Sequence, residues 1–326
     1  MENVLITGAC GFIGSNFAER CVDEGYNVAA FDRYNSFGDL GWLNESTYRD
    51  SINFILGDIR DYDSISKALQ GIDIVVHMAA LIGIPYSYVS PQAYIRTNIE
   101  GTYNVLEAAK NNNINQIIVT STSETYGTAQ YVPMDEKHPL VGQSPYSASK
   151  IAADQLAISY HRSFSSPVKI VRPFNTYGPR QSARAIIPTV FSQILSEFKE
   201  INLGSTSPTR DFTYVTDTCN AFLEVMKTDS LFGEVVNVGM NNEISIGDLV
   251  LLIQSITDRK IEITSKDERI RPKKSEVNRL YCDNSKLLKY TDWAPKHSLK
   301  QGLTKVYKWM SIDSNLAKYN SEEYNV

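Results

Sequence analysis

The chain of 326 residues carries 32 basic and 37 acidic side chains, which gives a formal net charge of −5 at pH 7. This acidic balance argues against a nucleic-acid-binding protein, although a local group of backbone amides can still hold a small anionic ligand. No apolar run approaches the roughly 18 residues of a membrane-spanning helix, and we expect no membrane association and no signal peptide.

The four cysteines are scattered and form no CxxC pair, so the sequence predicts neither a disulfide framework nor a zinc site. Scattered thiols fit a reducing compartment, and we expect a cytoplasmic protein. The four histidines show no HExxH spacing, and no metal is predicted. His77 ends a predicted strand, where we expect a packed, hydrogen-bonded side chain rather than a catalyst.

Short apolar strands alternate with longer helical patterns through the first half of the chain. Because these strands are continuously apolar, they are typical of a parallel sheet that is buried on both faces. The predicted strands are 4–7, 27–31, 52–56, 74–77, 116–120 and 168–171, and the predicted helices are 12–23, 94–110 and 146–164.

Prolines and glycines become frequent after about Pro173, and the alternation loosens. We predict an α/β protein with a Rossmann-type doubly wound parallel sheet in residues 1–175 and a smaller substrate-binding lobe in residues 176–326. Some segments of the second half are expected to return to the first domain. Helical patterns in the second half cover 187–200, 217–227, 246–256 and 299–309.

Three glycines connect the first predicted strand to the first predicted helix. Gly8, Gly11 and Gly14 have a spacing that lets the backbone turn sharply and bring a pyrophosphate to the helix N-terminus. Asp32 ends the second strand, where a carboxylate can bind ribose hydroxyls and repel a 2′-phosphate, although Arg33 beside it can accommodate one. The pattern predicts a dinucleotide site that prefers NAD.

Two further features are compatible with such a site. Asp58 follows the third strand, where it can contact the adenine or cap the next helix, and the sequence does not decide between these roles. Tyr146 and Lys150 lie four residues apart on one predicted helix, which places their Cβ atoms about 5–6 Å from each other. An ammonium near a phenol lowers the pKa of the phenol, and the tyrosine can then act as a base.

The segment after the strand at 116–120 begins Ser121-Thr122-Ser123-Glu124. Ligands of open parallel sheets bind beyond the carboxyl ends of the strands, where this segment is expected to lie. A cluster of hydroxyl and carboxylate side chains here can also cap a helix N-terminus, and that interpretation stays open.

Taken in order, these motifs resemble the extended short-chain dehydrogenases/reductases that act on nucleotide sugars. The resemblance covers nearly the whole chain and implies an NAD cofactor, with Tyr146 and Lys150 beside its nicotinamide. It also implies a sugar diphosphate near Asn175, Arg210 and Arg271. The residues that the resemblance assigns to NAD are Gly8, Gly11, Phe12, Ile13, Gly14, Asp32, Asp58, Ile59, Ala79, Ala80, Asn98, Tyr146 and Lys150.

The subclass depends on Glu124, because simple 4-epimerases resemble this region but carry small residues there. The sequence around Thr122 and Ser123 is similar to that of nucleotide-sugar 4,6-dehydratases. This resemblance implies that Thr122 orients the 4-hydroxyl and Tyr146 removes its proton while the C4 hydride passes to NAD. It further implies that Glu124 removes the C5 proton, that water leaves from C6, and that the hydride returns to C6. Either Glu124 or Ser123 is expected to protonate the departing water. A 4-epimerase and a UDP-glucuronate decarboxylase are the alternatives.

The segments 80–88 and 178–188 resemble NAD-dependent dehydratases of legionaminic-acid pathways. That resemblance implies a GDP- or UDP-linked N-acetylglucosamine as substrate. A dinucleotide-sensing regulator without turnover is the non-enzymatic alternative, and the intact Thr122, Glu124, Tyr146 and Lys150 argue against it. Apolar and small residues on several faces of helices 94–110 and 146–164 predict a homodimer.

Overall fold

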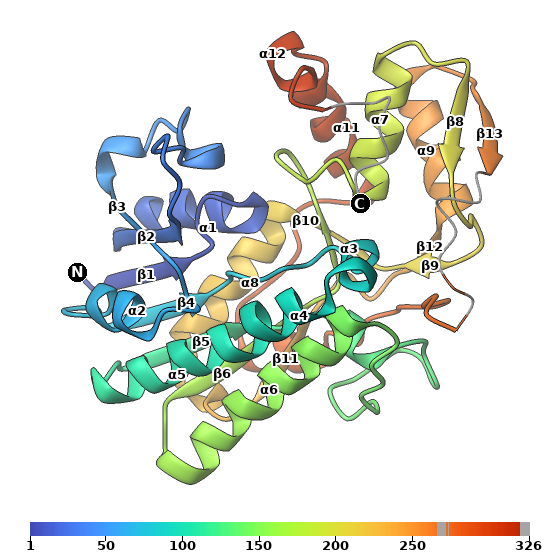
Figure 1. Ribbon diagram of the computed structural model, residues 1–326. Coiled ribbons are helices and arrows are strands. Elements are labelled where there is room, and N and C mark those ends of the chain that lie inside the picture. Colours follow the sequence, from blue (N-terminus) through green and yellow to red (C-terminus); the bar gives the residue numbers. More distant parts are fainter. Residues whose placement is uncertain (266–271, 273, 320–326) are drawn as a thin grey trace.

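The computed structural model describes residues 1–265, 272 and 274–319. Its centre is a seven-stranded parallel sheet (Figure 1), which confirms the predicted fold class. The strands are β1 (Asn3–Thr7), β2 (Asn27–Arg33), β3 (Ile52–Gly57), β4 (Ile74–His77), β5 (Gln116–Thr120), β6 (Val168–Pro173) and β11 (Val235–Val238). Their spatial order is β3-β2-β1-β4-β5-β6-β11, so the chain changes direction across the sheet between β1 and β4.

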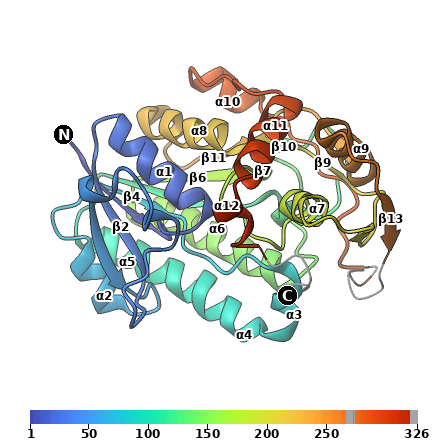
Figure 2. The ribbon, with the colours of Figure 1, turned by 90° about the horizontal axis from the view of Figure 1, so that it is seen from above.

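Helices cover both faces of this sheet (Figures 1 and 2). On one face, α1 (Phe12–Asp23) packs on α8 (Val215–Lys227). On the other, α2 (Tyr62–Ala68), α5 (Gly101–Asn111) and α6 (Pro145–Phe164) form a neighbouring row. Both α8 and β11 come from the second half of the sequence. Strand β11 pairs with β6 at the edge of the sheet, and α8 packs against β6 and α1.

The remaining elements form smaller units beside the carboxyl ends of the strands. Paired strands are β7 (Asn175–Tyr177) with β10 (Phe212–Tyr214), β9 (Thr209–Arg210) with β12 (Ile244–Ser245), and β8 (Glu200–Leu203) with β13 (Glu262–Ser265). The helices are α3 (Ile84–Val89), α4 (Pro91–Tyr94), α7 (Ile186–Leu195), α9 (Ile246–Thr257), α10 (Ser285–Tyr290), α11 (Leu299–Met310) and α12 (Asp313–Leu316). Among the described residues, no helix is long and apolar enough to cross a bilayer.

A capping box in the sequence marks the start of helix α6. Ser144 is the N-cap, its Oγ accepts a hydrogen bond from the Ser147 amide, and the Ser147 hydroxyl binds the Ser144 amide in return. Pro145 occupies the first turn, where a missing N–H costs nothing. This capping box fixes where the helix starts and therefore which face carries Tyr146 and Lys150.

Candidate active site

The glycine turn lies at the point where the sheet order reverses, between β1 and β4. Gly8 has a φ of +71°, and a Cβ atom there would lie 2.8 Å from the backbone of Ala79, so both the conformation and the space require glycine. A Cβ atom on Gly14 would lie 2.1 Å from the carbonyl oxygen of Gly8. The turn is therefore packed tightly against the sheet, with the α1 N-terminus directed beyond β1.

This N-terminus has the features that a pyrophosphate requires. Gly11 is the N-cap of α1, no side chain caps it among the described residues, and its first turn, which starts Phe12-Ile13, holds no acidic residue. A Cβ atom on Gly11 would meet only the Gly8 carbonyl oxygen, at 3.4 Å, so the side facing away from the sheet is open. Free amides and the positive end of the helix dipole fit an anionic diphosphate.

Replacing Gly14 by alanine should lower the free energy of unfolding by about 1–3 kcal/mol or more, because the methyl group meets backbone that cannot move aside. Gly247→Ala is the matched control, since its nearest neighbour would lie 3.6 Å away and the position is in helix α9. Urea unfolding should show a loss for the first variant and no loss for the second. Equal stability of the two variants would contradict the tight turn.

Asp32 lies at the end of β2 and supports the same turn. One carboxylate oxygen accepts the backbone N–H of Cys10 at 2.8 Å, and the other accepts that of Arg33 at 2.7 Å. The side chain is half-buried at the rim of the turn. Its structural role is thus to fix the glycine loop, and its ribose contact stays a prediction.

Asp58 pairs with Arg60 through an ion pair of 2.5 Å, which lowers the pKa of its carboxyl group. The N-cap of α2 is Asp61, whose side chain accepts the Asp63 amide. The capping role considered for Asp58 is therefore wrong, because the cap lies three residues further on. Its neighbour Ile59 is buried against Gly101 at the start of α5.

The helix predicted at 94–110 is interrupted by a π-helical stretch, Ile95–Glu100. Asn98 lies in it, almost fully buried, and its amide exchanges hydrogen bonds with the backbone of Leu81 and donates to Ser149 Oγ. A π-bulge often marks a functional position, because it turns one side chain out of the regular helical register. Asn98 thereby fixes the segment that follows the half-buried Ala79 and Ala80.

His77 is buried between two hydroxyl groups, Thr7 Oγ1 at 2.8 Å and Thr102 Oγ1 at 3.1 Å. Burial, with a smaller contribution from the Lys150 charge, lowers the pKa of His77 to about 3. A neutral, hydrogen-bonded imidazole confirms the prediction of a packed side chain.

Tyr146 lies in the first turn of α6 and is 7 % exposed. Its phenol hydrogen-bonds the side chain of Thr122, and its ring meets that of Tyr94 edge-on, with centroids 6.2 Å apart. Lys150 is also buried, and its Nζ donates to the carbonyl oxygen of Thr120 at 2.6 Å. The structure therefore brings Tyr146, Lys150 and the loop after β5 together.

The expected lowering of the Tyr146 pKa is wrong for this arrangement. Burial raises the pKa of the Tyr146 phenol, the Glu124 carboxylate raises it further, and the hydrogen bond from Thr122 only partly offsets them. The Lys150 ammonium does not offset them, because it is directed at the Thr120 carbonyl. Spacing on a helix predicted the proximity of the two residues but not the direction of the ammonium.

Glu124 lies in a short 3-10 helix, η4 (Ser123–Tyr126), and Thr122 immediately precedes it. Thr122 is its N-cap and accepts the Glu124 amide, so the capping interpretation holds for this side chain alongside its bond to Tyr146. Ser123 is buried, whereas Glu124 is half-buried and close enough to Tyr146 to raise the phenol pKa.

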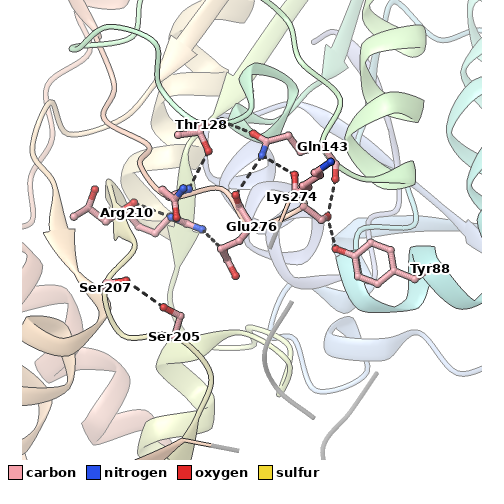
Figure 3. Close-up of polar contacts among 11 residues, drawn as sticks. Tyr88, Thr128, Gln143, Ser205, Ser207, Arg210, Lys274 and Glu276 are labelled. Atoms are coloured by element: carbon pink, nitrogen blue, oxygen red, sulfur yellow. Dashed lines mark hydrogen bonds and ion pairs between the residues drawn. The ribbon is translucent and has the colours of Figure 1, made fainter. Parts of the chain in front are cut away.

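A second polar cluster lies in the C-terminal half, beside the strands β7 and β9. Asn175 Oδ1 is buried and has no hydrogen-bond partner among the described residues. The backbone N–H of Asn175 donates to the backbone carbonyl oxygen of Asp211. Arg210 donates to the Thr209 carbonyl and lies 3.5 Å from Glu276 (Figure 3). Arg271 lies outside the described residues.

Sequence reasoning missed the residues that connect this cluster to α6. Figure 3 shows Gln143, just before α6, donating to the backbone carbonyls of Lys274 and Glu276. Ser275 in turn donates to the Gln143 carbonyl and bonds the hydroxyl of Tyr88 from α3 at 2.6 Å. These contacts join segments more than a hundred residues apart, and no periodicity or motif in the sequence signals them.

The chain matches the family model described as GDP-mannose 4,6 dehydratase over residues 5–306. A UDP-glucuronate 4-epimerase from Thermodesulfobacterium geofontis is 30% identical, with 98% of this chain and 99% of that one covered. The crystal structure of DesIV, a dTDP-glucose 4,6-dehydratase from Streptomyces venezuelae with NAD and TYD bound, superposes with a TM-score of 0.88 at 25% identity, covering 98% of this chain and all of that one.

The structure of TunA, an NAD-dependent NDP-hexosamine 5,6-dehydratase of tunicamycin biosynthesis, gives a TM-score of 0.84 at 25% identity over 99% of this chain and 100% of that one. The family-model match over most of the chain settles the membership. The chain belongs to the GDP-mannose 4,6-dehydratase family of extended short-chain dehydrogenases/reductases.

Proposed function

We propose that this chain is an NAD-dependent nucleotide-sugar 4,6-dehydratase that converts a nucleotide-linked hexose to its 4-keto-6-deoxy form. The observation that carries the proposal is the position of Glu124. This carboxylate lies near the Tyr146 phenol, in the same short helix that Thr122 caps. Removal of the C5 proton needs a base close to C4, where Tyr146 starts the oxidation, and the Glu124 carboxylate can be that base.

The dinucleotide would bind beyond the carboxyl ends of β1 and β4, where the strand order changes direction. The α1 N-terminus would bind its pyrophosphate, Asp32 its ribose, and Asp58 and Ile59 the adenine side, while Ala79, Ala80 and Asn98 would shape the inner wall. A bound NAD would supply a hydride acceptor for C4, the source of the hydride that C6 receives, and a positive charge that favours the phenolate of Tyr146.

The side chains divide the proton transfers between them. Thr122 orients the 4-hydroxyl and Tyr146 accepts its proton, so a ketone forms at C4. The ketone makes the C5 proton acidic, and Glu124 removes it. Loss of hydroxide from C6 then needs a proton, which either Glu124, now protonated, or the buried Ser123 can deliver. Once C6 has received the hydride, C5 takes up a proton, and the 4-keto-6-deoxy sugar is complete.

We propose N-acetylglucosamine, linked to GDP or UDP, as the sugar. The two segments that resemble legionaminic-pathway dehydratases meet in space: a Cβ atom on Gly83 would lie 2.9 Å from Nη1 of Arg184. Tyr94 contacts the same place, since its hydroxyl binds the Gly83 carbonyl and its ring meets Tyr146. The likeness to TunA, whose name records a hexosamine nucleotide, supports an amino sugar.

A nucleotide-sugar 4-epimerase is the second candidate, because an epimerase is 30% identical over almost the whole chain. An epimerase needs the Tyr146 chemistry but no second base, so Glu124 favours the dehydratase. A UDP-glucuronate decarboxylase would use the same ketone to take up the electrons left when the sugar carboxylate departs as carbon dioxide. Incubation with a panel of nucleotide sugars and NAD, followed by mass spectrometry, separates the three as loss of water, an isomer, or loss of carbon dioxide.

Arg210 is proposed to bind the substrate diphosphate. Arg210→Met should weaken nucleotide-sugar binding about tenfold or more, since a hydrogen bond to a charged group contributes about 1.5–3 kcal/mol. NAD binding should be unchanged, because the α1 N-terminus belongs to the first sheet. Calorimetric titration with each ligand checks this, and Arg279→Met, at an exposed ion pair with Glu243, is the control. Equal nucleotide-sugar affinity in the two variants would remove Arg210 from the diphosphate site.

We further propose a cytoplasmic homodimer. The cysteines are free thiols, as a reducing compartment would leave them. Apolar side chains at Ile95 and Tyr103, 54 % and 45 % exposed, lie along the π-helical stretch Ile95–Glu100 and α5 and would be covered by a second copy. Light scattering of the purified protein checks the oligomeric state.

A further inference from the structure

The segment after β5, residues 121–126, carries Thr122 and Glu124 and is called the catalytic loop below. An ion pair that has no role in the reaction described above is buried beneath it. Asp154 on α6 and Arg172 on β6 are 0 % and 2 % exposed, and Arg172 Nη2 donates to Asp154 Oδ2 at 2.6 Å. Enclosing two charges in this way is costly, and replacing such a pair by apolar side chains is often neutral or stabilising. Stability alone therefore does not account for its presence.

The pair is bonded directly to the loop that carries the reactive side chains. Ser121 donates to the same Asp154 oxygen at 2.6 Å and receives a bond from Arg172 Nε at 3.3 Å. The Arg172 guanidinium also lies over the ring of Tyr126, 4.6 Å from its centroid. Arg172 and Asp154 thus contact both ends of the segment that contains Thr122 and Glu124.

The pair also faces the lysine. Asp154 follows Lys150 by one helical turn, which places the two side chains on the same side of α6. Its second oxygen, Oδ1, is buried without a hydrogen-bond partner among the described residues. Burial lowers the pKa of Lys150, and the Asp154 charge opposes that lowering.

We propose that Asp154 and Arg172 are a pair of positioning residues: they fix the loop through Ser121, and Asp154 supplies the negative charge that keeps Lys150 an ammonium donor to Thr120. The proposal rests on the proposed function, because the Lys150 ammonium holds Thr120 at the end of β5, where the segment with Thr122 and Glu124 begins. Neither residue is assigned contact with the substrate. Among the described residues, the charged or titratable groups that act on Lys150 are Asp154 on its own helix and neutral His77 from β4. Tyr146 lies one turn before Lys150 on α6, Arg172 from β6 pairs with Asp154, and Glu124 from η4 acts on Tyr146.

The sign of the expected pH effect follows from this arrangement. Removing Asp154 takes away the group that holds the proton on Lys150, so the decline of kcat at alkaline pH should begin about one pH unit or more lower. Asp154→Asn also leaves Arg172 buried without its counter-ion, which lowers the pKa of Lys150 further and destabilises the fold. The double variant Asp154→Leu with Arg172→Met removes both charges and should recover the melting temperature of the unaltered protein.

The pH at which kcat declines in each variant distinguishes a positioning role of Asp154 from a role in stability alone. We expect kcat to begin its alkaline decline at the highest pH in the unaltered enzyme, at a lower pH in the double variant, and at the lowest pH in Asp154→Asn. Of these three proteins, only Asp154→Asn should have a lowered melting temperature. Asp217→Asn is the control, since this buried carboxylate binds the amides of Lys296 and His297 and should affect stability without changing the pH at which kcat declines. A double variant with an unchanged pH profile and kcat would overturn the proposal.

A second readout does not depend on turnover. NMR of protein labelled at the lysine side chains, with Lys150→Arg to assign the signal, reports the Lys150 titration directly. In both Asp154 variants the signal should titrate at lower pH than in the unaltered protein, and an unshifted titration would also overturn the proposal. If no nucleotide sugar is turned over while the titration still shifts, the proposed function has failed and the Asp154–Lys150 coupling stands.

Discussion

Tyr146→Phe should reduce kcat by about 10²–10⁴-fold, because it removes the phenol oxygen that we propose as the acceptor of the C4 hydroxyl proton. The ring is retained, so its edge-on contact with Tyr94 and the start of α6 should be unaffected. Binding of NAD, measured by quenching of intrinsic fluorescence, should stay within a few-fold of the unaltered protein. Steady-state turnover of the nucleotide sugar gives the loss of kcat.

Tyr160→Phe is the matched control for this experiment. Tyr160 is a buried tyrosine on the same helix, but its hydroxyl donates to Glu107 on α5, away from the catalytic loop. Its variant should keep its kcat, although loss of the bond can lower stability slightly. Equal kcat values in the Tyr146 and Tyr160 variants would show that the phenol of Tyr146 does not start the reaction.

Glu124→Gln should stop the reaction after C4 oxidation, because the amide has the shape of the carboxylate but cannot accept the C5 proton. We expect water loss and exchange of the C5 proton with solvent to fall about 10²–10⁴-fold. Reaction in deuterium oxide followed by mass spectrometry measures both. The accumulation of reduced cofactor, seen by its absorbance, should rise above that of the unaltered enzyme.

Ser123→Ala separates the two proposed proton donors in the same assay. If Ser123 relays the proton to the departing water, its variant should keep C5 exchange and lose dehydration, whereas loss of Glu124 abolishes both. A Glu124→Gln enzyme that incorporates deuterium at C5 at the normal rate would remove Glu124 from the mechanism and favour an epimerase.

Six of the seven strands of the first sheet could be predicted from the sequence, whereas β11 is missing from the prediction. The predicted strands 74–77 and 116–120 agree with β4 and β5 residue for residue, because runs buried on both faces leave a continuous apolar signal. The helix predicted at 187–200 is wrong at its C-terminus: α7 ends at Leu195, and Glu197 has a left-handed φ of +58°. Glu200 instead begins β8, whose partner β13 lies some sixty residues further along the chain.

The site could be predicted only where a local motif encodes it. The glycine turn, the Tyr146 and Lys150 pair and the loop after β5 are all local, and the structure places them beyond the carboxyl ends of neighbouring strands. The electrostatics could not be predicted, because they depend on burial and on distant partners. The direction of the Lys150 ammonium is set by Thr120, thirty residues away.

The central claim is that one active site oxidises C4 and removes water across C5 and C6 of a nucleotide-linked hexose. A substrate deuterated at C4 tests it most directly, with the product analysed by NMR and mass spectrometry. The account predicts a product that has lost one water and carries the C4 deuterium at C6. Deuterium recovered at C4 of an isomer that has lost no water would contradict it.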